Sequence, residues 1–186
     1  MGQIIEAISY NLTNLFRFGG ADRRSVFWPY AGCVIGLAMA AMAAVMLPEM
    51  QAGMARMEEF AAGNPDKATI QRGPGHYSIK VQGHHPELMP DMGNITTGMS
   101  VVFAVTVLLL AAAVARRLHD TGRSGAWGLM PLPFIIYAMV MMPRLLGASD
   151  PDMGLFFSLV INNLLYLASL ALLVVLLARP GKAGAA

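Results

Sequence analysis

The chain has 186 residues, of which 56 % are hydrophobic and only 13 % are charged, whereas soluble domains carry about 25 % charged residues. So little charge cannot cover a globule of this size, which argues against a soluble enzyme, and the net charge of +2 argues against a nucleic-acid-binding protein. The single cysteine excludes a disulfide framework and a zinc site built from several thiolates. The composition therefore indicates a small integral membrane protein.

The N-terminal segment predicts a short amphipathic helix. Its apolar residues recur at helical spacing: Ile4, Ile5, Ile8, Leu12, Leu15 and Phe16. Such a helix either lies in the membrane interface or packs under the helix bundle, and the sequence leaves both open. We expect Gly19 and Gly20 to end it, and Asp22 to cap the helix that follows.

Four apolar stretches are long enough to cross a hydrocarbon core about 30 Å thick, which takes about 20 helical residues. They cover residues 27–47, 98–115, 126–146 and 154–178. Backbone groups in lipid have to be hydrogen-bonded within their own segment, so each stretch is expected to be a helix, with Pro131 and Pro133 unwinding the start of the third. The predicted fold class is all-α: one membrane domain over residues 1–186, with four transmembrane helices preceded by the amphipathic helix.

The segment 48–97 is predicted to be a long extramembrane loop, too short and too polar to form a separate core. Methionines at 39, 42, 46, 50, 54 and 57 keep to one helical face, so the first helix is expected to continue to about Phe60. Weak alternation over Tyr77–Gln82, between turn-forming glycines, predicts a hairpin strand.

The same loop holds a set of candidate copper ligands. They are His84, His85, Met89 and Met92. Thioether and imidazole together suit Cu(I), which makes extracytoplasmic metal handling an alternative function. A methionine stripe at helical spacing is ordinarily a packing face, however, so we expect no metal site and no cofactor.

The charges are sorted between the two sides of the membrane. The N-terminal segment, the loop after the second stretch and the C-terminal tail together hold eight cations, whereas the loop 48–97 holds four cations and six anions. The rule that cytoplasmic loops are rich in Lys and Arg then predicts that both termini are cytoplasmic.

The loop after the second stretch carries the most informative motif. It reads Arg116-Arg117-Leu118-His119-Asp120-Thr121-Gly122-Arg123-Ser124-Gly125-Ala126-Trp127. We expect Gly122 to permit the left-handed turn that stops the helix, Ser124 to cap the next helix and Trp127 to lie at headgroup depth.

This string resembles the signature R-R-L-H-D-x-G-x-S-G-W-W of the domain of unknown function 805 family of small bacterial inner-membrane proteins, with Ala126 where an aromatic residue is usual. Residues 20–28 are similar to a second pattern of that family, G-R-x-S-R-x-E-F-W, although Ala21 and Val26 replace the usual arginine and glutamate. The resemblance implies a bacterial inner-membrane protein and names no activity.

Both motif segments fall on the predicted cytoplasmic side, and we expect them to form one hydrogen-bonded layer that clamps the ends of the first three spans. The excess of arginine over aspartate in this layer predicts a site for anionic lipid headgroups or an acidic partner. Its cations are Arg23, Arg24, Arg116, Arg117 and Arg123. The other motif residues are expected to be structural: Asp22, Trp28, His119, Asp120, Gly122, Ser124, Gly125 and Trp127.

No residue is predicted to be catalytic. His119 stands beside Asp120, but neighbours on a helix point about 100° apart, so the carboxylate cannot orient the imidazole well. A lipid-modifying enzyme centred on His119 remains an alternative to the leading interpretation, a non-enzymatic interaction or accessory protein. Its expected partners are anionic membrane lipids, a protein or a second copy of the chain, and not nucleic acid. In the last span, Asn162 and Asn163 are expected to bond a neighbouring helix.

Overall fold

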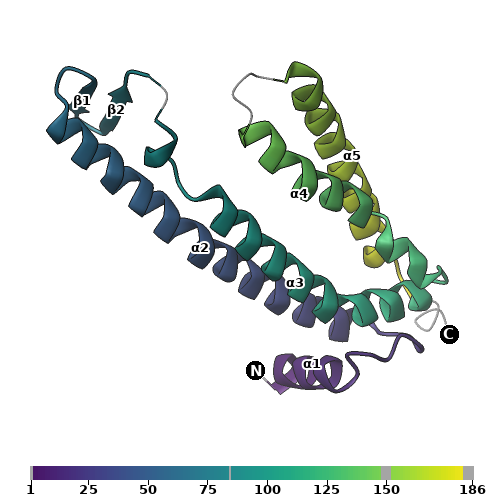
Figure 1. Ribbon diagram of the computed structural model, residues 1–186. Coiled ribbons are helices and arrows are strands. Elements are labelled where there is room, and N and C mark those ends of the chain that lie inside the picture. Colours follow the sequence, from purple (N-terminus) through teal and green to yellow (C-terminus); the bar gives the residue numbers. More distant parts are fainter. Residues whose placement is uncertain (1, 84, 148–151, 182–186) are drawn as a thin grey trace. The chain divides into compact units, whose positions relative to one another are not determined.

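The computed structural model describes residues 2–83, 85–147 and 152–181 (Figure 1). In chain order its elements are α1 (Gly2–Thr13), α2 (Arg24–Gly63), β1 (Ala68–Gly73), β2 (His76–Val81), η1 (Pro86–Leu88), α3 (Met92–Asp120), η2 (Gly125–Leu129), α4 (Leu132–Gly147) and α5 (Met153–Ala178). Four helical segments are long and apolar enough to cross a membrane: α2, α3, η2 with α4, and α5. The all-α membrane fold class is therefore confirmed.

The chain divides into two compact units, Met1–Met39 with Ser100–Ala186, and Ala40–Met99. The first unit has its core where one end of α2 meets α3 and α5. Phe27 and Tyr30 of α2 pack there with Leu118 of α3 and Leu176 of α5, all almost fully buried. The Tyr30 hydroxyl donates to the Leu109 carbonyl at 2.8 Å, which satisfies the polar tip of an otherwise apolar contact.

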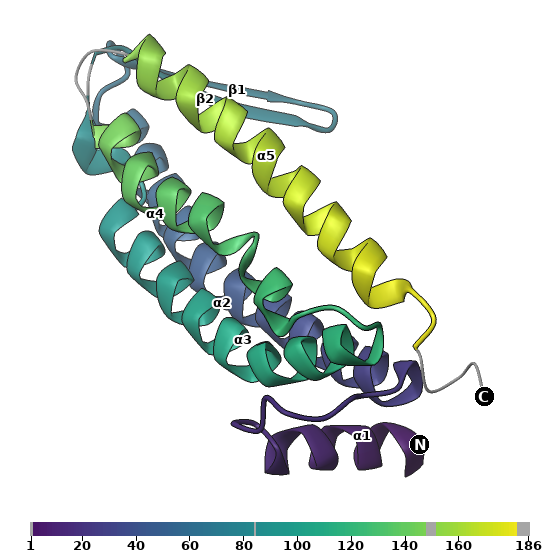
Figure 2. The ribbon, with the colours of Figure 1, turned by 90° about the vertical axis from the view of Figure 1, so that its right-hand side faces the viewer.

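The helices α4 and α5 lie side by side in both ribbon views (Figures 1 and 2). The Asn162 amide donates to the Phe134 carbonyl at 2.9 Å, which confirms the expected interhelical bond for Asn162. The prolines act as predicted: the chain makes the short 3-10 turn η2, and α4 begins only at Leu132, after Pro131. A proline in the first helical turn removes no intrahelical bond, so Pro133 is tolerated there.

The N-terminal helix is shorter than predicted and buries a different face. It ends at Thr13 rather than at the glycine pair, and the Asn14 side chain, just beyond this end, donates to the Tyr10 carbonyl. Its buried residues are Ala7 and Asn11. Most of the apolar residues that defined the predicted face are exposed: Ile4, Ile5, Leu12 and Phe16. The helix therefore packs against its own unit and also leaves an apolar stripe uncovered.

The second unit holds the distal part of α2, the hairpin and the start of α3. The hairpin pairs Ala68 with Val81 and Gly73 with His76, which confirms the predicted strand. The helix α2 continues to Gly63, as the methionine spacing indicated. The glycine at position 98 lets α3 approach α2 closely, because a Cβ there would lie 2.6 Å from Val45 Cγ1.

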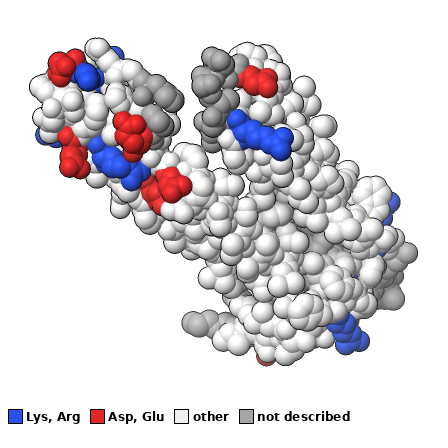
Figure 3. All heavy atoms as spheres, viewed as in Figure 1, with Lys and Arg blue, Asp and Glu red and all other residues white. Residues whose placement is uncertain are grey.

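Charged side chains gather at the ends of the helices. In the view of Figure 3, the surface over the middle of α4 and α5 shows no charge, and Arg144 and Asp152 lie at the helix ends near the connection between them. This distribution is typical of helices whose central parts face hydrocarbon.

Candidate functional site

A glycine in the left-handed conformation ends α3. Gly122 has φ 76°, the left-handed conformation expected from the sequence. The Arg123 amide donates to the Leu118 carbonyl and the Gly122 amide to the His119 carbonyl, both at 2.9 Å. These two bonds form a Schellman motif, which satisfies carbonyls that the helix end would otherwise leave free. The motif fixes the last turn of α3 and with it the two arginines of that turn.

The guanidinium of Arg116 is buried, with 1 % of the residue exposed, and it makes four hydrogen bonds. Its Nε donates to Asp22 Oδ2 at 2.8 Å, and Nη2 donates to Asn11 Oδ1 at 2.7 Å. Nη1 donates to the carbonyls of Asn14 and Arg17 at 2.8 and 2.6 Å. Arg116 therefore ties α1 and the segment after it to the end of α3.

The guanidinium of Arg117 is also buried, with none of the residue exposed, and it points to a different set of partners. It forms an ion pair with Asp120 and donates to the Asp22 carbonyl. Its Nε donates to the Leu177 carbonyl at 2.9 Å, and Nη2 donates to the carbonyl of Arg179. Because the last carbonyls of a helix have no intrahelical partner, Arg117 serves as the C-terminal cap of α5.

Together these residues form what we call the arginine cluster: Asp22, Arg116, Arg117 and Asp120. Its two cations and two carboxylates balance. A buried charge is tolerated only when it is paired and hydrogen-bonded, and both guanidiniums meet that condition. The cluster therefore holds α1, α3 and α5 together. Its arginines have no exposed surface that a ligand could contact.

This arrangement changes several expectations. The clamp joins the end of the fourth span, α5, and the N-terminal helix rather than the start of the third span. In the described part of the chain, Asp22 accepts from Arg116 and from the Tyr10 hydroxyl at 3.2 Å, and it does not cap α2. Burial and the neighbouring Asp22 carboxylate raise the pKa of Tyr10.

Around the cluster lies a set of cations that we call the exposed arginines. They are Arg17, Arg23, Arg24, Arg123 and Arg179. Among the described residues, the structure gives none of them an ion pair; Arg24 Nε donates to the Arg179 carbonyl at 3.2 Å. The exposed acid of α1 is Glu6, so this surface keeps an excess of positive charge. Arg23 and Arg24 also line a cavity of about 480 Å³ beside the cluster.

The remaining motif residues shape the connection between α3 and α4. Ser124 caps η2, as predicted, by accepting from the Ala126 amide at 3.3 Å. Gly125 is required by close approach, since a Cβ there would lie 3.0 Å from the Ala115 Cβ and 3.3 Å from His119 Nε2. His119 is exposed beside this turn. Both tryptophans, Trp28 and Trp127, are partly exposed.

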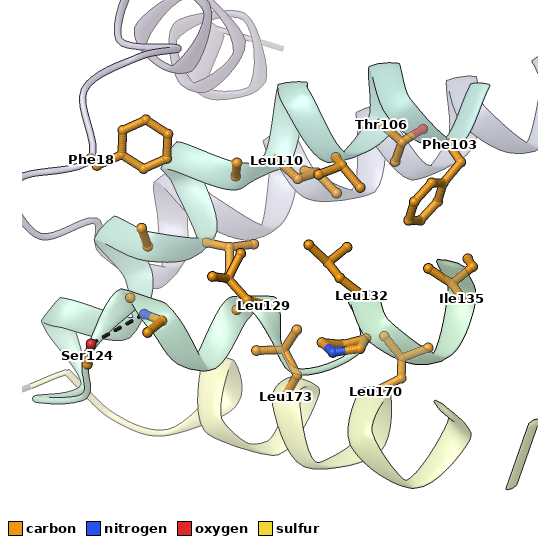
Figure 4. A pocket seen from close by; sticks show the side chains of 18 of the residues that line it. Phe18, Phe103, Thr106, Leu110, Ser124, Leu129, Leu132, Ile135, Leu170 and Leu173 are labelled. Atoms are coloured by element: carbon orange, nitrogen blue, oxygen red, sulfur yellow. Dashed lines mark hydrogen bonds between the residues drawn. The ribbon is translucent and has the colours of Figure 1, made fainter. Parts of the chain in front are cut away.

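An apolar cavity of about 530 Å³ opens beside this turn, between α3, η2 with α4, and α5 (Figure 4). The close-up shows side chains of these three elements facing one another across the space. All but four of its lining residues are apolar or glycine, the exceptions being Thr106, His119, Ser124 and Tyr166. The Thr106 hydroxyl donates to the Val102 carbonyl of its own helix, so its polarity is satisfied.

The candidate copper ligands lie in the second unit. His85 Nδ1 is 2.8 Å from Glu87 Oε1, and its ring packs on Phe60 with centroids 4.6 Å apart. Met89 and Met92 are exposed. His84 lies outside the described residues. Among the residues that are described, no group of three or more His, Cys, Asp or Glu side chains could hold a metal ion.

Several contact residues of the site were not expected from the sequence. Asn11 and Tyr10 supply a carbonyl oxygen and a hydroxyl to the cluster, and the segment Leu177–Arg179 supplies backbone carbonyls. Asn11 follows Ile4 by seven positions and Ile8 by three, so it borders the apolar stripe, and this polar residue at its edge was the one available signal. Every residue has a backbone carbonyl, so the sequence does not indicate which carbonyls accept from Arg117. The contact of Arg117 with the end of α5 could therefore not be predicted.

The resemblance carried by the two motifs is confirmed by comparison with protein families. A model for a protein of unknown function (DUF805) matches residues 15–186, and the chain therefore belongs to this family. No curated protein and no solved structure matches it.

Proposed function

We propose that this member of the DUF805 family is a non-enzymatic protein of the bacterial inner membrane, with cytoplasmic termini, whose exposed arginines bind anionic lipid headgroups. One observation carries the proposal. The arginine cluster neutralises itself in the interior, while the exposed arginines beside it have no ion-pair partners among the described residues. The cations of the cluster are already paired with carboxylates, whereas the exposed arginines can still pair with a negatively charged ligand.

The orientation follows from the charges on the two sides. The end of the first unit that holds the cluster is the cation-rich one, whereas the segment 48–97 holds four cations and six anions. By the positive-inside rule, the cation-rich end faces the cytoplasm. The cytoplasmic leaflet is also the one whose anionic lipids attract basic segments, by about 1 kcal/mol per cation near the surface.

The helix α1 supports a position at the membrane surface. Its exposed apolar stripe contains Ile4, Ile5 and Leu12, and Phe16 follows with 72 % of its surface exposed. A helix that presents such a stripe next to cations lies in the interface plane with its apolar face among the acyl chains. The exposed arginines near α1 then lie at headgroup depth, where Trp28 and Trp127 are also suitably placed as interfacial tryptophans.

The test compares lipid composition around variants of equal charge. We replace Arg23, Arg24 and Arg123 by glutamine in one variant, and Lys67, Arg72 and Lys80 of the opposite loop by glutamine in the other. Each protein is extracted from native membranes into polymer-bounded discs, and the ratio of phosphatidylglycerol to phosphatidylethanolamine is measured by mass spectrometry.

We expect phosphatidylglycerol to be enriched around the wild type, the first variant to lose this enrichment and the second to keep it. High salt should weaken the enrichment, because exposed charges are screened. If the first variant retains the full enrichment, the exposed arginines do not bind lipid and the proposal fails in favour of an acidic protein partner.

A further inference from the structure

The apolar cavity beside η2 has the composition of a site for hydrocarbon. Its walls come from α3, α4 and α5, three of the elements that are long and apolar enough to cross a membrane. Water is not held in such a space, because it would find too few polar partners there. In a bilayer, the molecules that reach an open apolar cavity at this depth are acyl chains.

The length of the cavity also suits an acyl chain. On α3 its lining runs from Phe103 to His119, sixteen positions apart, which at 1.5 Å per residue is about 24 Å. Half of a hydrocarbon core is about 15 Å thick, so the cavity can accommodate the whole chain of a lipid in one leaflet. Its volume of about 530 Å³ lies in the range of sites for small ligands.

Two of the four polar lining residues lie at one end of the cavity. His119 and Ser124 line this end together with Phe18. Phe18 directly follows Arg17 and Ser124 directly follows Arg123, so the backbone of two exposed arginines adjoins this end of the cavity, although neither arginine is one of its lining residues. Among the described residues, no Asp or Glu lines the cavity. The mouth is therefore complementary to a negatively charged headgroup, and the interior to its chain.

We propose that this cavity binds one anionic phospholipid of the cytoplasmic leaflet, with an acyl chain between α3, α4 and α5 and its phosphate at the mouth between Arg17 and Arg123. The inference rests on the proposed function and goes further, because it assigns a single bound lipid to a defined place. Lipid tails are as apolar as the cavity walls, so transfer from the bilayer gains little hydrophobic free energy. Selectivity therefore comes from the arginines, and the cavity supplies shape and position.

The experiment uses phosphatidylglycerol with a photoactivatable diazirine in its acyl chain, and phosphatidylcholine with the same chain as the matched probe. Each is added as a minor component to phosphatidylcholine nanodiscs that contain the full chain. After irradiation, the labelled residues are identified by mass spectrometry. Labelling of cavity residues such as Val107, Leu132 and Leu170 is compared with labelling of Leu164 and Leu167, which are exposed on α5 and do not line the cavity.

We expect the anionic probe to label the cavity residues about tenfold more than the neutral probe, and both probes to label the outer leucines equally. Replacing Arg17 and Arg123 by glutamine should reduce cavity labelling by the anionic probe to that of the neutral one. Val107→Trp should block cavity labelling, and Val105→Trp, on the same helix but outside the cavity, should not.

Equal labelling of the cavity by both probes would overturn the assignment of an anionic lipid, and labelling confined to the outer leucines would overturn the site itself. Both readouts come from the wild-type protein, so they hold even if a tryptophan variant fails to fold. Loss of the cavity signal with phosphatidylglycerol enrichment intact would refute this inference alone. Full enrichment retained by the variant in which Arg23, Arg24 and Arg123 are glutamine would refute the proposed function.

Discussion

The ion pair between Arg116 and Asp22 offers the sharpest test of the buried cluster. Both side chains have 1 % of their surface exposed, and Nε lies 2.8 Å from Oδ2. The substitution Asp22→Asn keeps the shape of the side chain and removes its charge. It leaves Arg116 as a buried cation whose remaining acceptors are neutral oxygens of Asn11, Asn14 and Arg17.

The expected cost follows from this geometry. Removing one partner of a buried ion pair typically destabilises a protein by about 3–5 kcal/mol. Arg116 keeps three hydrogen bonds after the substitution, so we expect the lower end, about 3 kcal/mol. The double variant Asp22→Asn with Arg116→Met should recover part of this loss, because an apolar side chain leaves no buried charge unpaired.

The assay is reversible unfolding of the purified protein in mixed micelles, followed by circular dichroism as denaturing detergent is added. Asp66→Asn is the matched control, since Asp66 is exposed and its substitution also removes one negative charge. Substitutions of exposed residues usually change the free energy of unfolding by no more than about 0.5 kcal/mol. If Asp22→Asn is no more destabilising than Asp66→Asn, the cluster does not hold the fold together and the reasoning is wrong.

Three further outcomes are expected. Arg117→Gln should free the last carbonyls of α5, and a protease added to inside-out vesicles should then cut the end of this helix faster than in the wild type. Gly98→Val should cost about 1–3 kcal/mol through its clash with the stiff side chain of Val45, whereas Gly36→Ala, with open space around it, should be neutral or stabilising in the same unfolding assay. Burial and a neighbouring carboxylate raise the pKa of Tyr10 above its usual value of about 10, so the folded state keeps a proton that the unfolded chain loses. Stability should therefore fall as the pH rises above about 10, and Tyr10→Phe should reduce that slope in unfolding measured across alkaline pH.

The elements whose signals are local could be predicted well. A run of apolar residues, a proline pair and a hairpin glycine each act within a few positions, and the spans, the delayed start of α4 and the strand His76–Val81 agree with them. The same holds for Gly122 and Ser124, where the turn conformation and the cap depend on the residue itself. Such features need no knowledge of what packs nearby.

The arginine cluster could be predicted only in part. Opposite charges in the two motifs correctly indicated that Asp22 and Arg116 meet, since the pair is chemically complementary. That both arginines are buried could not be read from the sequence, because arginine next to a membrane end is ordinarily exposed to phosphates. The buried face of α1 was missed for a related reason: the apolar periodicity described residues that are largely exposed, and Asn11 at the edge of that stripe makes the contact.

The bonds from Arg117 to the end of α5 have a consequence for the order of assembly. Its carbonyl acceptors lie 60 and 62 residues later in the chain. At a synthesis rate of about 5–20 residues per second, Arg117 waits roughly 3–12 s for these partners. During that interval only part of its final set of partners exists, namely Asp120 and the Asp22 carbonyl. The last helix therefore completes the hydrogen bonding of a guanidinium that the earlier part of the chain satisfies only in part.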